Sequence, residues 1–570
     1  MIKVQQILKP NGNVDYIECP LIGYALLNNP KLNKGAAFTQ QEREQFGLLG
    51  TLPEHIETLQ EQCDRLYQQY QEKNTDLQKN IFLNSLHDVN ETLFYQLVSQ
   101  HLKEMLPIIY TPTVGDAVER FSLELRRPRG VYISYNNRNH IEQLLQNRAN
   151  AEIDLIVVTD GEGVLGIGDQ GIGGMDISIA KLMVYTLCAG INPHRVLAIQ
   201  LDVGTNNDRL LNDPMYLGWR HQRISGQQYD DFIGQFVDAV RKVMPGVYLH
   251  WEDFGRDNAR KNLNRYRQQM CTFNDDMQGT GIVTLANVIS ATEATGQKLS
   301  DHRIVVLGAG TAGVGIADQL FDAMCHSGLS EQAARQRFWL LDRNGLLLDN
   351  QGNLPDFQQP YIRKLDEISD WSVSEPGQAN LAEVVTHVHP TIIIGCSTLK
   401  GAFTESIVKE MASHVDHPII MPLSNPTSHS EADPKDLIEW TKGRALVAAG
   451  SPFPPVEYQG KTIRISQGNN AFVFPGLGLG VIVSQATRMT DKMIFSAAQA
   501  LSKHSPSRQD KNAPLLPDFD DIQQISHDVA LAVAKQAIAE GVAGIDANTD
   551  LEILLKGAMW QAEYYPYRKL

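Results

Sequence analysis

A short apolar run followed at once by a glycine-rich turn constrains the fold of this chain more than any other feature. Residues 303–307 (RIVVL) lead into Gly308-Ala-Gly310-Thr-Ala-Gly313 and then into apolar residues at helical spacing. In this order the pattern predicts a strand, a tight turn and a helix whose N-terminus faces a pyrophosphate. The sequence therefore predicts a Rossmann-type domain that binds a dinucleotide, with Gly308, Gly310 and Gly313 around its phosphates.

The next predicted strand, RFWLLD, ends in an acid, Asp342. A carboxylate here bonds the hydroxyls of the adenosine ribose and repels a 2′-phosphate, so it favours NAD over NADP. The insertion GLSEQAARQR makes the separation from the glycines longer than the usual ~20 residues. Arg343 follows directly and could soften the repulsion of a phosphate.

The same glycine pattern occurs a second time, at Gly166-Ile-Gly168-Asp-Gln-Gly171. This copy lies beyond the turn TDGE, which favours a hairpin, and Asp169 would place a negative charge beside any phosphate. A later strand (VLAIQLD) also ends in an acid, Asp202, so spacing alone does not exclude this copy. The sequence favours the other copy as the nucleotide site, and a tight strand-to-helix turn is the alternative for both.

The character of the chain changes along its length. Residues 54–104 are rich in helix-favouring Gln, Glu, Leu and Lys, whereas β-rich runs alternate with helical stretches from Val131 onward. Such alternation is typical of α/β domains with a parallel sheet. The predicted parts are a helical N-terminal region (1–125), an α/β catalytic domain (126–276, completed by 467–540), a Rossmann-type NAD-binding domain (277–466) and a C-terminal tail (541–570).

Composition limits the class of partner. The net charge of −16 argues against nucleic acid, which requires a basic face. No run approaches 18 apolar residues, and the N-terminus lacks the apolar core of a signal peptide. The six cysteines show no CxxC spacing, which favours reduced thiols. We therefore expect a cytoplasmic enzyme with no nucleic-acid and no membrane partner.

Two pairs of acids stand where predicted strands give way to helices. Glu252 and Asp253 follow the apolar run VYLHW, and Asp275 and Asp276 precede the predicted helix TGIVTLANVISA. Solvation of a strand end or the dipole of a helix could explain either pair alone. Four carboxylates in a chain that also binds a dinucleotide suit Mg²⁺ or Mn²⁺, hard cations that prefer oxygen ligands.

Several other polar residues have both a structural and a functional interpretation. Lys181, in the apolar helix ISIAKLMVYTL, could extend to solvent or, partly desolvated, act as a base. Tyr110, in PIIYTPTVG, could be a packing residue. Asn425, after an apolar strand, and Asn469 and Asn470, in a later loop, could simply form Asx turns.

Together these segments resemble the malic enzyme family over nearly the whole chain. No single motif is decisive, but many occur in the same order. The matching segments are NKGAAFTQQERE, PIIYTPTVG, VVTDGEGVLGIGDQG, HWEDFGRDNA, TFNDDMQGT, VVLGAGTAGVGIA, PLSNPT and QGNNAFVFPG.

The resemblance implies catalytic and metal-binding roles. Lys181 is similar to the base that takes the proton of the substrate hydroxyl, and Tyr110 to the acid that protonates the enol carbon. Asp275 is a neighbouring acid in the catalytic group. The expected ligands of Mg²⁺ or Mn²⁺ are Glu252, Asp253 and Asp276.

The resemblance also implies contacts with NAD and with the substrate, L-malate. The expected cofactor-binding residues are Gly308, Gly310, Gly313, Asp342, Asp276 and Asn425. The expected substrate-binding positions are Asn425, Asn469, Asn470 and Gly163, the last standing where the family usually has an arginine. That arginine is expected to grip a malate carboxylate as a fork, a role that Arg126, Arg127 or Arg129 could take over here.

The departure at Gly163 opens an alternative. Together with MDISIAKL and YLHWEDFGR, it resembles malolactic enzymes, which retain the cofactor and release lactate. YTPTVG, the long N-terminal region and WQAEYYPYR instead resemble bacterial NAD-dependent malic enzymes. We expect oxidative decarboxylation of L-malate to pyruvate and CO₂ with reduction of NAD. The malolactic reaction is the alternative, and a non-catalytic nucleotide-binding regulator is a remote one. The family likeness further implies a homodimer or homotetramer.

Overall fold

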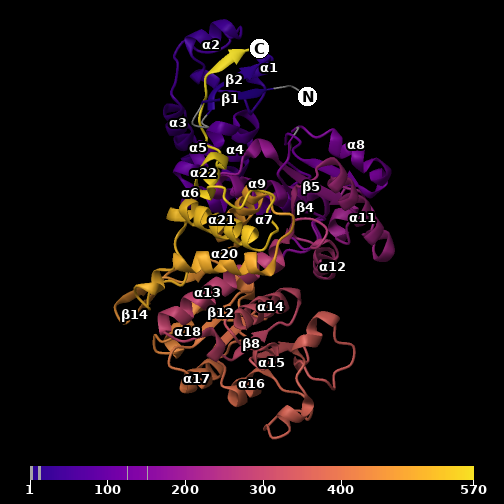
Figure 1. Ribbon diagram of the computed structural model, residues 1–570, viewed down its shortest axis with the longest axis vertical. Coiled ribbons are helices and arrows are strands. Elements are labelled where there is room, and N and C mark those ends of the chain that lie inside the picture. Colours follow the sequence, from indigo (N-terminus) through magenta and orange to yellow (C-terminus); the bar gives the residue numbers. More distant parts are fainter. Residues whose placement is uncertain (1–3, 10–13, 125, 151) are drawn as a thin grey trace. The chain divides into compact units, whose positions relative to one another are not determined.

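The computed structural model describes residues 4–9, 14–124, 126–150 and 152–570 (Figure 1). It contains two compact units. The first comprises Met1–Phe254, Ile482–Thr487 and Gly544–Leu570, and the second comprises Gly255–Val481 and Arg488–Ala543. The first unit ends its main segment at Phe254, whereas the predicted catalytic domain ends at residue 276. Compact units and functional domains need not have the same bounds, and the predicted domain bounds stay a prediction.

The N-terminal part of the first unit is helical, as predicted. The capping box at Thr39 and Glu42 is present, because each side chain accepts a hydrogen bond from the other's backbone N–H. A small sheet joins the two ends of the chain, with β17 parallel to β2. Its strands are β1 (Gln5–Leu8), β2 (Val14–Cys19) and β17 (Tyr567–Lys569). The helices are α1 (Gly23–Leu27), α2 (Gln40–Gln45), α3 (Leu59–Gln71), α4 (Asp76–Val89), α5 (Glu91–Gln100), α6 (Leu102–Ile109) and α7 (Thr113–Glu119).

A parallel sheet forms the rest of the first unit, and its strands run in the order β3-β5-β4-β6. They are β3 (Val131–Ser134), β4 (Leu155–Thr159), β5 (Val196–Asp202) and β6 (Tyr248–Trp251). The helices of this part are α8 (Ile141–Gln146), α9 (Met175–Ala189), α10 (Asp208–Asn212) and α11 (Gly226–Val243), and α22 (Leu551–Ala558) follows near the C-terminus. The α/β series predicted from residue 131 is confirmed.

Helix α9 is the apolar centre of this unit. The stretch Gly171–Ala189 has a mean hydropathy of 1.3, and by length and composition it could cross a membrane. In the structure 94% of it is buried, which is how the core helix of a folded domain behaves. A charged residue in such a helix must therefore find its partner inside the protein.

The second unit contains a seven-stranded sheet in the order β10-β9-β8-β11-β12-β13-β16. All neighbouring pairs are parallel except β10 with β9. The strands are β8 (Ile304–Leu307), β9 (Phe338–Asp342), β10 (Gly345–Leu346), β11 (Ile392–Gly395), β12 (Ile419–Pro422), β13 (Leu446–Ala449) and β16 (Ser466–Gln467). The strand order reverses beside β8, and in such sheets ligands bind outside the carboxyl ends of the strands at this point.

The second unit also contains further helices and short strands. They are α12 (Arg256–Tyr266), β7 (Thr272–Asn274), α13 (Thr280–Thr295), α14 (Thr311–His326), α15 (Glu331–Arg335), α16 (Leu381–Val388), α17 (Glu405–His414), α18 (Pro434–Trp440), β14 (Val456–Tyr458), β15 (Lys461–Ile463), α20 (Asp491–Lys503) and α21 (Ile522–Ala539). Helix α19 (Phe474–Ser484) precedes α20 in the chain. The helical character predicted after Asn470 is thus confirmed.

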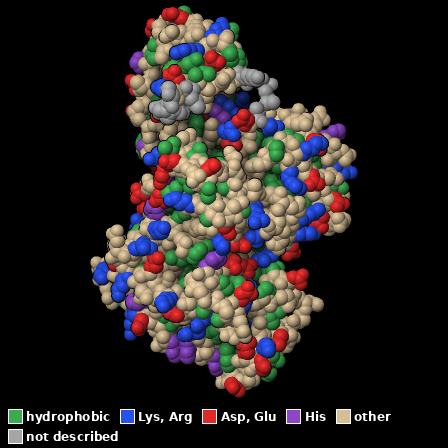
Figure 2. All heavy atoms as spheres, in the orientation of Figure 1, with side chains coloured by type: hydrophobic (Ala, Val, Ile, Leu, Met, Phe, Trp, Pro, Cys, Tyr) green, Lys and Arg blue, Asp and Glu red, His purple; other side chains and the backbone are tan. Residues whose placement is uncertain are grey.

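Acidic and basic side chains are interspersed on the face that Figure 2 draws. All six cysteines are free thiols, as their spacing predicts.

Candidate active site

Lys181 lies in the middle of α9 with its side chain almost entirely buried, only 2% exposed. Its Nζ lies 3.0 Å from Oε1 of Glu252, which follows β6. The same Nζ lies 5.2 Å from the ring centroid of Tyr110. Because the side chain is buried, the solvent-reaching conformation is excluded. An ammonium group that is buried requires a negatively charged partner, which Glu252 provides. Three of the predicted site residues therefore lie together in the first unit.

Glu252 is held from its other side by a histidine. Nε2 of His250 lies 2.7 Å from Oε2 of Glu252, and Nδ1 of His250 lies 2.7 Å from the hydroxyl of Tyr185. Sequence reasoning missed both residues. A signal was present, because His250 interrupts an apolar strand two positions before Glu252 and Tyr185 follows Lys181 by one helical turn.

Tyr110 ends α6 and is buried, 5% exposed. Its backbone N–H closes the helix on the carbonyl of Leu106 at 2.9 Å. The chain then turns through Thr111 and Pro112 into α7. The helix end thus fixes the backbone of Tyr110 and places its ring beside the amine of Lys181.

Asp253 adopts a left-handed backbone conformation, with φ of +54°. Residues other than glycine rarely do so, and Asp and Asn are among the exceptions. The conformation turns the chain sharply after β6, and the carbonyl of Asp253 accepts a 2.9 Å bond from the backbone N–H of Gly163. Strain of this kind is concentrated at functional sites.

Gly163 packs closely against that turn. A Cβ at this position would lie 3.0 Å from the carbonyl oxygen of Phe254, closer than side chains normally approach. The family arginine would therefore require the backbone of the 253–254 turn to move. Its absence here matches the local geometry of the chain.

The arginines that could replace it are engaged elsewhere. Arg126 pairs with Asp176 on α9, and Nε of Arg129 donates a 2.7 Å bond to Asp88. With Arg127 they line a cavity of about 410 Å³ in the first unit. Ile179 also lines it, and residues two positions apart differ by about 200° around a helix. Lys181 therefore points away from this cavity, so these contacts do not place an arginine beside it.

The glycine pattern at 166–171 does not form a phosphate cradle. Its Asp169 accepts hydrogen bonds from Nε of Arg223 at 2.6 Å and from the hydroxyl of Thr205 at 2.8 Å. Val164 and Gly168 form an antiparallel bridge. The motif is a tight turn that the ion pair between Asp169 and Arg223 stabilises.

The glycine pattern after β8 has the geometry of a dinucleotide loop. Gly308 has φ of +100°, and a Cβ there would lie 2.5 Å from the backbone of Cys396. A Cβ at Gly313 would lie 2.1 Å from the carbonyl oxygen of Gly308, so this glycine allows α14 to approach the strand closely. A Cβ at Gly310 would meet nothing within 4 Å. The second glycine therefore borders open space, where a pyrophosphate approaches in this fold.

Asp342 lies at the end of β9, next to that loop. Its carboxylate accepts a 2.9 Å bond from the N–H of Arg343 and a 3.1 Å bond from Nε2 of Gln358. The same nitrogen of Gln358 donates to the carbonyl of Ala309 at 2.6 Å. The acid is thus oriented beside the glycine loop, at the place expected for a ribose-binding carboxylate.

Asp275 and Asn470 lie together in the second unit. The side-chain amide of Asn470 donates to the carboxylate of Asp275 at 3.0 Å and to the hydroxyl of Thr280 at 3.2 Å. Asn469 caps the following turn, since its side-chain oxygen accepts from the N–H of Ala471 at 2.9 Å. The Asx-turn alternative is therefore correct for the local conformation of Asn469, whereas Asn470 orients an acid. Asp276, next in the chain, is half-buried.

Asn425 follows β12 and is exposed. Its side-chain oxygen accepts a 2.5 Å bond from the hydroxyl of Ser451, which follows β13. Both residues stand beyond the carboxyl ends of their strands, at the same edge of the sheet as the glycine loop. Asn425 is therefore at the ligand-binding edge of the Rossmann sheet.

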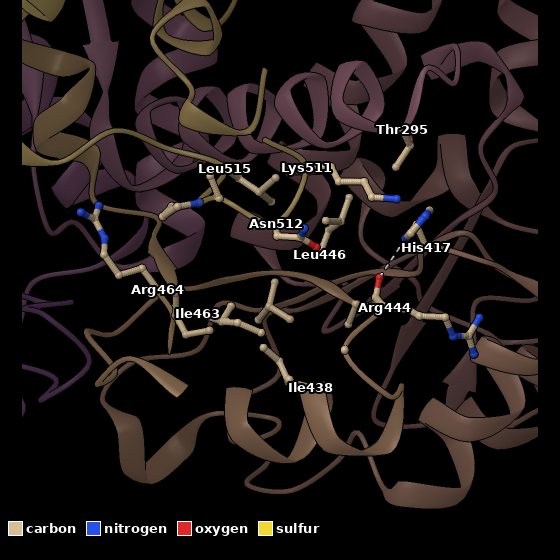
Figure 3. A pocket seen from close by; sticks show the side chains of 16 residues that line it. Thr295, His417, Ile438, Arg444, Leu446, Ile463, Arg464, Lys511, Asn512 and Leu515 are labelled. Atoms are coloured by element: carbon tan, nitrogen blue, oxygen red, sulfur yellow. Dashed lines mark hydrogen bonds between the residues drawn. The ribbon is translucent and has the colours of Figure 1, made fainter. Parts of the chain in front are cut away.

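A further cavity of the second unit, shown in Figure 3, contains none of the predicted site residues. It is lined by His417, which precedes β12, and by Leu446, which begins β13, together with Lys511 and Leu515 from a later loop. The amino ends of the strands lie here. This cavity is therefore at the edge of the sheet opposite to the glycine loop.

The donor set at the end of β6 fits a divalent cation. Glu252 and Asp253 are consecutive carboxylates, and both are buried. Buried carboxylates require compensating positive charge, and oxygen donors are those that Mg²⁺ and Mn²⁺ prefer. The residues present therefore match a hard cation and not a zinc site of imidazole and thiolate ligands.

Comparison with known proteins identifies the family of this chain. Residues 87–267 match the family model for the malic enzyme N-terminal domain, and residues 277–538 match that for the malic enzyme NAD-binding domain. NAD-dependent malic enzyme 3 of Bacillus subtilis is 52% identical over 557 residues, covering 97% of this chain and 98% of the relative. NAD-dependent malic enzyme of Escherichia coli K12 is 51% identical over 550 residues, covering 96% and 97%.

Solved structures share the fold. The malic enzyme of Entamoeba histolytica superposes with a TM-score of 0.55 at 20% identity, covering 90% of each chain. That of Pyrococcus horikoshii gives a TM-score of 0.54 at 20% identity, covering 80% of this chain and 88% of its own. Two family models that together span most of the sequence, and relatives that share half of its residues, lead to one conclusion: the chain belongs to the malic enzyme family.

Proposed function

We propose that this protein is an NAD-dependent malic enzyme, which oxidises L-malate at C2 and releases pyruvate and CO₂. The names of relatives that share 51–52% of its residues support this reaction. The observation that carries it is the buried group of Lys181 as base, Glu252 as the carboxylate that orients this base, and Tyr110 as acid. A regulator without catalysis would have no reason to bury these groups, so the non-catalytic alternative is not supported.

The chain's own residues account for the proton transfers. In its neutral form, Nζ of Lys181 takes the proton of the C2 hydroxyl and becomes an ammonium, which Glu252 at 3.0 Å holds in place. When bound, the divalent cation supplies a Lewis acid at the C2 oxygen, and NAD supplies the acceptor for the C2 hydride. Once CO₂ has left, the hydroxyl of Tyr110 gives a proton to C3. Burial of both side chains keeps water from competing for these protons.

Three carboxylates are the proposed metal ligands: Glu252, Asp253 and Asp276. All three match the ligand positions of the family motifs HWEDF and FNDDMQGT. Asp275 is the proposed neighbouring acid, oriented by the amide of Asn470. We further propose that Asp276 and Asn425 contribute to the nicotinamide side of the cofactor, and that Asn425, Asn469 and Asn470 contact malate.

Identification of the product tests the proposed function. Purified protein with L-malate, NAD and Mn²⁺ is expected to form NADH, followed at 340 nm, and pyruvate in equal amounts. The absence of the family arginine, with the tight packing at Gly163, favours the malolactic reaction, as do the segments MDISIAKL and YLHWEDFGR. Lactate accumulating without net NADH would establish that alternative and refute ours.

Replacing Asp342 is expected to weaken the preference for NAD. A hydrogen bond to a charged group contributes about 1.5–3 kcal/mol, so Asp342→Ala should reduce the ratio of kcat/KM for NAD to that for NADP by about 10- to 100-fold. Arg343→Ala should increase the ratio. The exposed Asp356 provides a control, since Asp356→Ala should leave it unchanged. An unaltered ratio in Asp342→Ala would show that this acid does not read the ribose.

We also propose a cytoplasmic homodimer or homotetramer without nucleic-acid or membrane partners. The net charge of −16 argues against a nucleic-acid partner, and the family likeness supports the oligomer. Sedimentation that gives one species at the chain mass of 63.5 kDa would contradict it.

A further inference from the structure

Two parallel contacts join α9 to the end of β6. Lys181 and Tyr185 are one helical turn apart and so lie on the same face of α9. His250 and Glu252 are two strand positions apart and so share a face of the sheet. Lys181 contacts Glu252 at 3.0 Å, and Tyr185 contacts His250 at 2.7 Å. Four helical residues rise about 6 Å and two strand residues about 6.7 Å, so the two pairs match in spacing.

The backbone beneath these contacts is fixed. The N–H of Glu252 donates a 2.9 Å bond to the carbonyl of Val158, which continues the pairing of β6 with β4. Only the side-chain torsions of Glu252 remain to be set. Lys181 reaches one carboxylate oxygen and His250 the other.

The hydrogen-bond directions follow from the chemistry of the groups. An ionised carboxylate only accepts, so Nε2–H of His250 donates to Oε2 of Glu252. In the neutral tautomer that carries its hydrogen on Nε2, Nδ1 accepts from the hydroxyl of Tyr185. The chain of donors therefore runs from Tyr185 through His250 to Glu252, and every one of these side chains is buried.

We propose that His250 and Tyr185 are positioning residues, which fix the rotamer of Glu252 and thereby set the affinity of the protein for its divalent cation. The inference rests on the proposed function, because it takes Glu252 as a metal ligand. In this proposal both side chains act through Glu252, to which they are linked by hydrogen bonds. Partners in this position orient ligands in metal sites, and their loss typically costs about 10- to 100-fold in metal affinity or activity.

Mn²⁺ binding without substrate tests the proposal, with electron paramagnetic resonance as the readout. His250→Leu is expected to raise the Mn²⁺ dissociation constant by about 10- to 100-fold. His250→Gln, whose side-chain amide can still donate to Glu252, should recover most of the loss. Tyr185→Phe keeps the ring and removes only the hydroxyl, so its effect should be smaller but in the same direction.

The kinetic signature separates positioning from general damage. The variants should require more Mn²⁺ for half-maximal activity, while kcat at saturating Mn²⁺ stays near that of the wild type. Tyr95→Phe, which removes the hydroxyl of another buried tyrosine in the same unit, is the matched control and should bind Mn²⁺ normally. If His250→Leu does not fold, Tyr185→Phe and His250→Gln decide the question.

The outcomes are distinct. Variants that are folded and bind Mn²⁺ within twofold of the wild type overturn the positioning role and leave the proposed function intact. A wild type that binds Mn²⁺ but does not turn over malate refutes the proposed function, while the ratio of dissociation constants still tests His250 and Tyr185. A loss of kcat that saturating Mn²⁺ does not restore also contradicts the proposal.

Discussion

Lys181→Ala is expected to lower kcat by about 10²- to 10⁴-fold, the range that a positioned general base contributes. The amine is buried, 3.0 Å from Oε1 of Glu252 and 5.2 Å from the ring centroid of Tyr110. Because bulk water does not reach this position, water does not take over the role of the base. Removing the amine also leaves Glu252 without this cation, and breaking a buried ion pair costs stability. The measurement must therefore distinguish lost chemistry from lost structure.

Chemical rescue makes that distinction. A small primary amine such as methylamine fits the space vacated in Lys181→Ala and can accept the proton, so added methylamine should restore part of the activity. Lys242→Met provides the surface control, because that lysine is 68% exposed and should be dispensable. A folded Lys181→Ala that retains more than a tenth of the wild-type kcat would remove this lysine from the proposed mechanism.

The glycine loop shows how much a local pattern can predict. A strand, three glycines and a helix form a turn whose conformation depends mainly on residues close together in the chain. The roles of Gly308, Gly310 and Gly313 can therefore be predicted from the sequence. The open space beside Gly310 and the close contact at Gly313 are as expected. The glycine pattern at 166–171 could be distinguished from a nucleotide loop for the same reason, because the acid Asp169 within it is visible in the sequence. In the structure this acid pairs with Arg223.

The immediate surroundings of Lys181 were less accessible. Sequence alone left open whether the amine reaches solvent, because that depends on which face of α9 meets the sheet. Tyr185 and His250 are 65 residues apart in the chain, and their contact follows from matched helix and strand spacings that no local motif encodes. Tertiary packing decides such contacts. The orientation of Asp275 by Asn470, 195 residues later, has the same origin.

The family resemblance supplied what packing physics could not. It assigned Lys181 as base and Tyr110 as acid, and the structure then brought the two side chains together in one unit. It also drew attention to Gly163 as a departure, and the close contact with the carbonyl of Phe254 gives that departure a physical setting. Contacts of malate and NAD with the asparagines depend on ligand geometry, so they remain predictions.

Asp253→Asn is expected to lower activity by about 10²- to 10³-fold without unfolding the protein. Asparagine tolerates the left-handed conformation that Asp253 adopts, φ of +54°, so the turn after β6 is retained. What is lost is one negative ligand for the cation. Metal-ion catalysis contributes several kcal/mol, and each 1.36 kcal/mol corresponds to a tenfold change in rate.

Comparison of two substitutions at this position separates strain from chemistry. Asp253→Gly also removes the carboxylate but adopts positive φ without a side-chain penalty, which relieves about 1 kcal/mol of conformational strain. Loss of the carboxylate should make this variant inactive, and relief of the strain should keep its unfolding midpoint at or above that of the wild type. Asp238→Asn, at a side chain 78% exposed, should change neither property. Treating the wild type with EDTA should abolish turnover, and Mn²⁺ should restore it. Full activity in Asp253→Asn, or turnover undiminished after complete metal removal, would show that this acidic turn is built for something other than a cation.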